Sequence, residues 1–138
     1  MKSASTTSLA GLGWILDEHI MTQPGVRRAL VLTADGLPGA VSRDLERDLA
    51  ERTAASVSGL QSLGRAVAEF AGCAGEQHEL LMIQYGGGCL LMMAAGEGTY
   101  LAVATDPDAD ISIITGEMAR AVSRLGRELG VAPRGGAA

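Results

Sequence analysis

The apolar positions at the start of the chain recur every three or four residues, which is the spacing of one helix face. These positions are Leu9, Leu12, Leu16 and Ile20. The pattern predicts a helix from Ser8 to about Thr22, with Thr7 or Ser8 as its N-cap.

Two apolar runs follow, RRALVLTA and LPGAVS, and the dipeptide Asp35-Gly36 lies between them. Asp-Gly favours the positive φ angles of a two-residue type I′ turn, whose twist matches the strands that it joins. The stretch therefore predicts a β-hairpin. Pro38 cannot donate a backbone hydrogen bond, which places the start of the second strand at a sheet edge.

The longest amphipathic segment, Asp44 to Gly72, predicts a helix with two apolar bands. The band of larger side chains is the predicted core face: Leu45, Leu49, Thr53, Leu60, Leu63, Val67 and Phe70. The second band holds smaller or less apolar side chains: Ala50, Ala54, Val57, Gln61 and Ala68. Small side chains allow close approach, so this band is either a seam for a second helix or an extension of the core contact.

Three further apolar runs, QHELLMIQY, CLLMMAA and TYLAVAT, are joined by the turns GGG and GEG and predict a meander. A last helix is expected after DPDAD, which supplies its N-cap, and Gly130 and Pro133 end it. The order is α-β-β-α-β-β-β-α. Hairpin connections make the sheet largely antiparallel, which places the fold in the α+β class with helices over the sheet. One domain at 8–130 is expected between disordered tails at 1–7 and 131–138.

Composition narrows the functional classes. The formal net charge of −5 argues against nucleic-acid binding, which requires clustered cations. Lysine occurs only at Lys2, so a P-loop with its lysine is excluded. No apolar run has the length of a signal peptide or a membrane span, so we expect a cytoplasmic protein. In that compartment Cys73 and Cys89 are expected to be buried, reduced thiols.

The polar motifs do not form a catalytic set. Gly86-Gly87-Gly88 joins two predicted strands, whereas a phosphate loop precedes a helix. His19 and His78 lack neighbouring ligands for zinc and neighbouring groups for a catalytic triad. DPDAD begins like a calcium loop but is not followed by that loop's glycine and glutamate. We therefore expect no enzymatic activity, no cofactor and no metal site, and favour a binding module or scaffold.

Four stretches in this order resemble the roadblock/dynein light chain family: LDEHI, PGVRRALVLTADGLPGAVS, AERTAASVSGLQSLGRAVAEF and LLMIQYGGGCLLMMAAGEGTYLAV. The likeness spans about Ser8 to Leu129 and looks closest to a bacterial branch from actinobacterial gene clusters. These clusters pair a roadblock protein with a small Ras-like GTPase and a sensor-kinase-like membrane protein. The resemblance implies an α/β/α sandwich, with the second helix on one face of a five-stranded antiparallel sheet and the first and third on the other. Gly39 departs from the family's larger apolar residue, so the second strand is expected to pack less well.

The resemblance also implies a homodimer, in which the third strands pair edge to edge and the second helices lie side by side. This favours the seam interpretation of the small-residue band. Mapped onto this chain, the dimer-interface candidates are Ala50, Ala54, Val57, Gln61, Leu80, Met82 and Gln84. The partner-binding candidates on the solvent side of the long helix are Arg52, Ser58, Gly59, Ser62 and Arg65.

The implied function is non-catalytic regulation or scaffolding of a small Ras-like GTPase in a bacterial signalling cluster. Two alternatives stay open. One is a scaffold that recruits a membrane sensor-kinase-like protein, and so is itself brought to the membrane, without affecting GTP turnover. The other is a small-molecule sensor, which would need an internal pocket.

Overall fold

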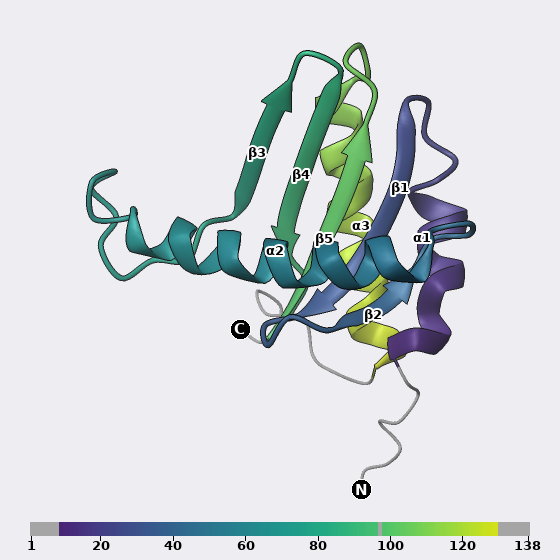
Figure 1. Ribbon diagram of the computed structural model, residues 1–138, viewed down its shortest axis with the longest axis horizontal. Coiled ribbons are helices and arrows are strands. Elements are labelled where there is room, and N and C mark those ends of the chain that lie inside the picture. The colour runs from purple at the N-terminus through teal and green to yellow at the C-terminus, as the bar shows by residue number, and fades with distance from the viewer. Residues whose placement is uncertain (1–8, 97, 130–138) are drawn as a thin grey trace, which may run out of the picture.

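The chain folds into three layers, with a sheet between α2 on one side and α1 and α3 on the other (Figure 1). The computed structural model describes residues 9–96 and 98–129, so both predicted tails and the expected cap and stop residues Thr7, Ser8, Gly130 and Pro133 lie outside the described residues. In chain order the elements are a 3₁₀ helix (Leu9–Leu12), α1 (Gly13–His19), β1 (Val26–Thr33), β2 (Pro38–Val41), α2 (Arg47–Ala66), β3 (Leu80–Tyr85), β4 (Gly88–Ala94), β5 (Thr99–Thr105) and α3 (Ile111–Glu128). The predicted order of elements, the α+β class and the position of α2 on the face of the sheet opposite α1 and α3 are confirmed. The first helix differs from the continuous helix predicted up to about Thr22, because its described part is a 3₁₀ turn followed by α1, which ends at His19.

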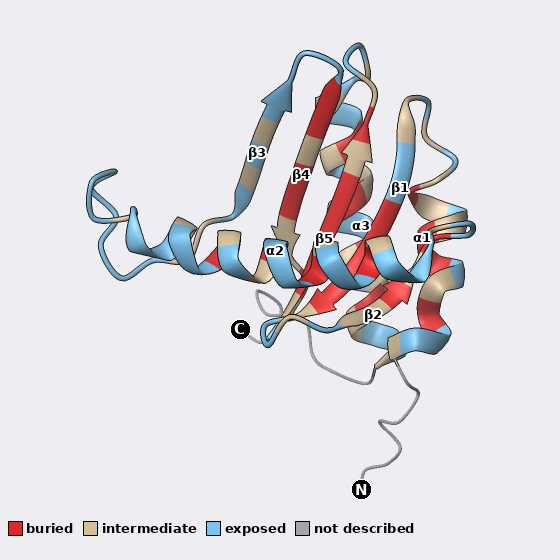
Figure 2. Ribbon diagram, viewed as in Figure 1, coloured by how far each residue is buried: buried red, intermediate tan, exposed pale blue. Residues whose placement is uncertain are grey.

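The sheet has the strand order β2-β1-β5-β4-β3, and all neighbouring strands are antiparallel. Side chains alternate between its two faces, since Ala29 and Val31 of β1 contribute to the core under α1 and α3, and Leu30 and Leu32 to the core under α2. Helices cover both faces of the sheet, which explains why the sequences of the central strands are continuous apolar runs. Burial is concentrated in β1, β4 and β5 (Figure 2).

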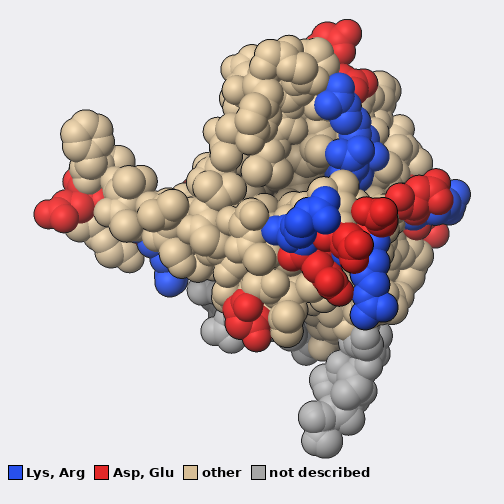
Figure 3. Space-filling view, in the orientation of Figure 1, with Lys and Arg blue, Asp and Glu red and all other residues tan. Residues whose placement is uncertain are grey.

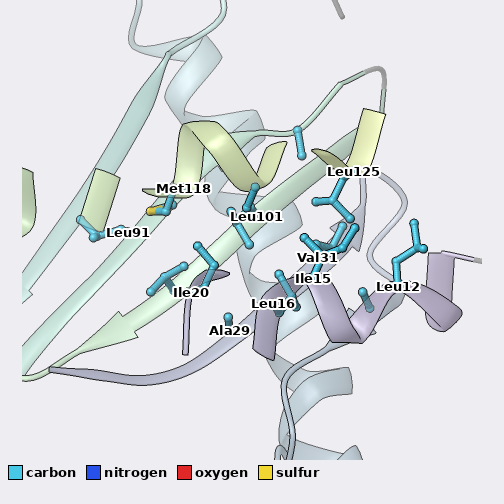
Figure 4. Close-up of a cluster of buried hydrophobic side chains, with 14 of the residues drawn as sticks. Leu12, Ile15, Leu16, Ile20, Ala29, Val31, Leu91, Leu101, Met118 and Leu125 are labelled. Carbon is cyan, nitrogen blue, oxygen red and sulfur yellow. The ribbon is translucent and has the colours of Figure 1, made fainter. Parts of the chain in front are cut away.

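The larger of the two cores lies between the sheet and the α1–α3 layer (Figure 4). Ile15 and Leu16 of α1 meet Met118 and Leu125 of α3 above the sheet, and all four are at most 1% exposed. The layer sits close to β2, because a Cβ at Gly13 would lie 2.6 Å from the carbonyl oxygen of Val41. Glycine at this position therefore lets α1 approach the sheet.

The connection between β1 and β2 differs from the predicted type I′ turn. Residues 34–37 form the loop, and the N–H of Gly36 donates to the carbonyl of Thr33 at 2.9 Å. Gly36 has a φ of 88°, but Asp35 is not among the described residues with positive φ. A type I′ turn requires positive φ at both central residues, so the predicted turn type was wrong. The hydroxyl of Thr33 instead accepts from the N–H of Leu37 at 3.2 Å and holds the longer loop closed.

The small-residue band of the long helix makes the core contact, which was one of its two open interpretations, whereas much of the band predicted as the core face is exposed. Ala50, Ala54 and Val57 are at most 2% exposed and pack on the sheet, whereas Leu63 is 62% exposed and Phe70 is 99% exposed. Small side chains let the helix approach the sheet closely, and the larger ones are left on its flank. The helix is also shorter than predicted, because it ends at Ala66.

Two further expectations need correction. Cys89 is buried as expected, but Cys73 is exposed, and both are free thiols. Gly39 does not leave β2 poorly packed, because a Cβ there would collide with Cδ2 of Leu9. The side chain of Leu9 occupies the space that a larger residue at position 39 would fill.

Asp110 caps α3 as its motif predicted, and its carboxylate accepts from the hydroxyl of Ser112 at 2.9 Å and the N–H of Ile113 at 3.2 Å. These hydrogen bonds lower the pKa of Asp110 below its usual 3.8, and the hydrogen bond from Ser112 has the largest effect. A carboxylate whose pKa is lowered by folding stabilises the fold above its unfolded pKa, and this contribution is lost as the pH falls through the folded pKa.

We therefore expect Asp110→Ala to lower the Tm at about pH 7, and the difference from the wild type to shrink as the pH falls below about 3.8. Thermal unfolding followed by circular dichroism over this pH range measures the effect. Asp108→Ala is the matched control, since Asp108 is an exposed carboxylate of the same loop. A difference for Asp110→Ala that stays constant down to low pH would contradict the charged-cap interpretation.

Candidate protein interaction site

The two edge strands of the sheet differ in how far other parts of the chain cover them. β2 has four residues, begins with Pro38 and is packed against the 3₁₀ helix through Leu9. β3 has six residues and, within the described part of the chain, pairs only with β4. An uncovered edge strand offers its free N–H and C=O groups to another chain. β3 is therefore the edge at which a second molecule can extend the sheet.

The side chains around this edge are uncharged and mostly apolar. β3, β4 and β5 contain no Asp, Glu, Lys or Arg in their sequences LLMIQY, GCLLMMA and TYLAVAT. On the face of the molecule that carries α2, the region over β3 and β4 is free of charge (Figure 3). Natural edge strands commonly carry charged residues that prevent unwanted pairing, and β3 has none.

The predicted interface residues on β3 are placed at the surface. Leu80 is 41% exposed and Met82 is 47% exposed, and Gln84 is exposed as well. The register pairs Leu80 with Met93 and Met82 with Leu91, so both side chains point to the α1–α3 side of the sheet. α3 contacts β4 but does not cover β3, which leaves this apolar row open.

The end of α2 and the turns after it project beyond β3 (Figure 1). Within this projecting part, the residues from Leu63 to Phe70 are called the overhang below. Leu63, Val67 and Phe70 of the overhang are 62%, 61% and 99% exposed. Large side chains that are this exposed are unusual in an isolated domain when they lie together, and they mark an interaction surface.

The predicted interface residues on α2 lie elsewhere, because the sheet covers them. Gln61 is 7% exposed, and its Oε1 accepts from the hydroxyl of Tyr100 on β5 at 2.9 Å. Ala50, Ala54 and Val57 belong to the core with Leu30 and Leu32, as described above. Their side chains cannot meet another helix, so the seam assignment is corrected. The flank of α2 that remains available is formed by Leu49, Thr53, Leu60, Leu63 and Val67.

Four of the five partner-binding candidates are exposed on α2: Arg52, Gly59, Ser62 and Arg65. Ser58 is only partly exposed, and its hydroxyl donates to the carbonyl of Ala34 in the β1–β2 loop at 2.6 Å. That hydrogen bond gives Ser58 a role in holding the loop against α2. The exposure of the overhang residues was not predicted, because helical periodicity assigned them to the core. The available signal was that the helix carried more apolar surface than a sheet covers.

The described residues contain no group of three His, Cys, Asp or Glu side chains placed to hold a metal ion. Among the described helices, none is long and apolar enough to cross a membrane. Two surface hollows of about 410 and 420 Å³ are present, one lined by Gln23, Asp106 and Asp110 among others, and one between α1 and α3.

A family model identifies the family of this chain. The family model of the Roadblock/LC7 domain matches residues 12–105. The chain belongs to the Roadblock/LC7 family. No curated protein matches the chain. The matched residues run from the end of the 3₁₀ helix to the end of β5, so they include the open β3 edge and all of α2.

Solved structures agree with this assignment. A Roadblock/LC7 domain from Streptomyces avermitilis is 32% identical, with a TM-score of 0.80 over 87% of this chain and 98% of that one. The gliding protein MglB from Thermus thermophilus is 22% identical, with a TM-score of 0.72 over 92% of each chain. A structure described as MglB with tetrameric arrangement is 20% identical, with a TM-score of 0.74 over 92% of this chain and 91% of that one. The two MglB structures share the fold.

Proposed function

We propose that this Roadblock/LC7 chain is a non-catalytic homodimer that regulates or scaffolds a small Ras-like GTPase in a bacterial signalling cluster. The observation that carries the proposal is the open, uncharged β3 edge beside the apolar overhang. Family membership and the likeness to MglB support the choice of a GTPase as partner.

In the proposed dimer, β3 of each protomer pairs with β3 of its partner. The two sheets then become one continuous sheet, and the free backbone groups of both edges are satisfied. The overhang of each protomer extends past its own sheet and comes to lie over the partner. Leu63 and Val67 thereby leave solvent, which supplies the hydrophobic driving force for association.

The same dimer forms a surface for the GTPase. Two α2 helices side by side present two copies of the exposed residues Arg52, Gly59, Ser62 and Arg65. These residues lie on parts of α2 that do not face the sheet, so dimerisation leaves them accessible to the GTPase. A second protein that binds here contacts both protomers, which couples GTPase binding to dimer formation.

Mixing the protein with a small Ras-like GTPase from a bacterial roadblock gene cluster tests the proposal. Light scattering is expected to show a dimer alone and a larger complex with the GTPase bound to a non-hydrolysable GTP analogue. Arg52→Glu and Arg65→Glu should weaken the complex without dissociating the dimer, since both side chains are exposed on α2. Arg28→Glu is the matched control, because Arg28 is exposed on β1 and lies outside this surface.

The GTP hydrolysis rate of the mixture separates the two forms of the proposal. A changed rate identifies a regulator. A complex with an unchanged rate identifies a scaffold, and the sensor-kinase-like membrane protein then becomes the next partner to test. If the GTPase forms no complex in its GTP-bound or GDP-bound form and its hydrolysis rate does not change, the GTPase proposal is wrong.

A further inference from the structure

A basic groove lies on the side of the sheet opposite α2, between α1 and α3. It has a volume of about 420 Å³ and is lined by His19, Ala119, Arg120, Ser123, Arg124 and Arg127. Three of the chain's ten arginines therefore gather in one hollow of a protein whose net charge is −5. This concentration of positive charge is independent of the β3 edge and of the proposed GTPase surface.

The groove keeps a positive charge after its own ion pairs are counted. Arg120 pairs with Glu117, and Arg124 pairs with Glu128 at 3.2 Å. Arg127 is exposed and has no carboxylate partner among the described residues. Guanidinium groups bind carboxylates through two parallel N–H···O bonds, so an unpaired arginine beside a paired one is suited to an incoming carboxylate.

The indole of Trp14, next to the groove, contacts one of these arginines. The guanidinium carbon of Arg124 lies 5.2 Å from the ring centroid of Trp14. A cation over an indole face is attracted by the ring and is restricted in orientation. Trp14 is 36% exposed, so part of the indole remains available to an apolar side chain. The groove thus combines a fixed guanidinium group with an apolar surface beside it.

The groove is lined by small side chains between the arginines. Ala119 and Ser123 are exposed and one helical turn apart on α3. Small residues let the backbone of another chain come close to the helix while the arginines reach its side chains.

We propose that this groove is a docking site for an acidic peptide segment of another protein. Carboxylates of the segment bind Arg127 and Arg124, and an apolar side chain packs on Trp14. An anionic membrane is a poorer occupant, because the site is concave and Glu117 and Glu128 flank its arginines. A peptide can place its carboxylates between these two acids, whereas a planar surface would meet them as well.

The test uses a short synthetic peptide that repeats Glu-Glu-Leu, and its counterpart that repeats Gln-Gln-Leu. Trp14 is the single tryptophan of the chain and the peptides contain none, so its emission reports on the groove through its contact with Arg124. The acidic peptide is expected to change this emission saturably, and the Gln counterpart is not. Calorimetry on the same samples gives Kd without relying on the indole.

Arg127→Gln is expected to raise Kd about ten-fold, as for the loss of one charge-assisted hydrogen bond, and Arg124→Gln by at least as much. Arg47→Gln is the matched control, because Arg47 is an exposed helical arginine that pairs with Glu51 on α2. Absence of binding overturns the proposal. An equal loss in Arg47→Gln also overturns it, because binding would then be non-specific. Binding to phosphatidylglycerol vesicles but not to the peptide would replace the peptide by a membrane surface.

Discussion

Met82→Lys is expected to be a monomer at concentrations at which the wild-type protein is a dimer. Met82 lies on the open edge strand and is 47% exposed in the single chain. A lysine there brings like charges together when two β3 strands pair, and like-charge contacts in an interface cost several kcal/mol. Such a cost corresponds to a rise of more than about a hundred-fold in the dimer Kd. Sedimentation equilibrium over a concentration series measures it.

Two variants show whether the effect belongs to the edge itself. Met82→Leu keeps an uncharged side chain of similar volume and should leave the dimer Kd within a few-fold of the wild-type value. Phe70→Ala removes the most exposed ring of the overhang and should weaken the dimer without changing the stability of the single chain. If Met82→Lys remains a dimer, the interface is not at β3. If the wild-type protein is a monomer throughout, the proposed dimer itself is wrong.

Val57→Asp is expected to prevent folding, whereas Leu63→Asp leaves the single chain folded. Val57 is 1% exposed between α2 and the sheet, and Leu63, on the same helix, is 62% exposed. A carboxylate at position 57 would be buried without a partner, which costs several kcal/mol in addition to the lost apolar contact. This approaches the whole stability of a domain of this size, which is about 5–15 kcal/mol.

Val57→Ala keeps the comparison measurable if the aspartate variant yields no soluble protein. Loss of the buried methyl groups is expected to lower the free energy of unfolding by about 1–3 kcal/mol. Leu63→Ala serves as the matched control and should change it by less than about 0.5 kcal/mol in a monomeric background such as Met82→Lys. Urea denaturation of both variants gives these values. A larger loss for Leu63→Ala than for Val57→Ala would mean that α2 faces the sheet with its other band.

The elements themselves are determined by the sequence. The helical spacing of Leu12, Leu16 and Ile20 and the apolar runs of the strands match the observed helices and strands, because local periodicity decides which backbone conformation gathers the apolar side chains. The family resemblance then predicted the three layers, and the Roadblock/LC7 match confirms the family. The cap at Asp110 is likewise a local feature, made by the residues directly after it.

Which surface each element presents was decided only by the tertiary structure. Periodicity shows that α2 has two apolar bands but does not show which one meets the sheet. The answer depends on residues far along the chain, such as Tyr100, whose hydroxyl donates to Gln61 across 39 positions. The groove beside Trp14 likewise requires α1 and α3 to lie together. Helix formation depends on neighbours a few residues apart, whereas exposure depends on how distant elements share the core.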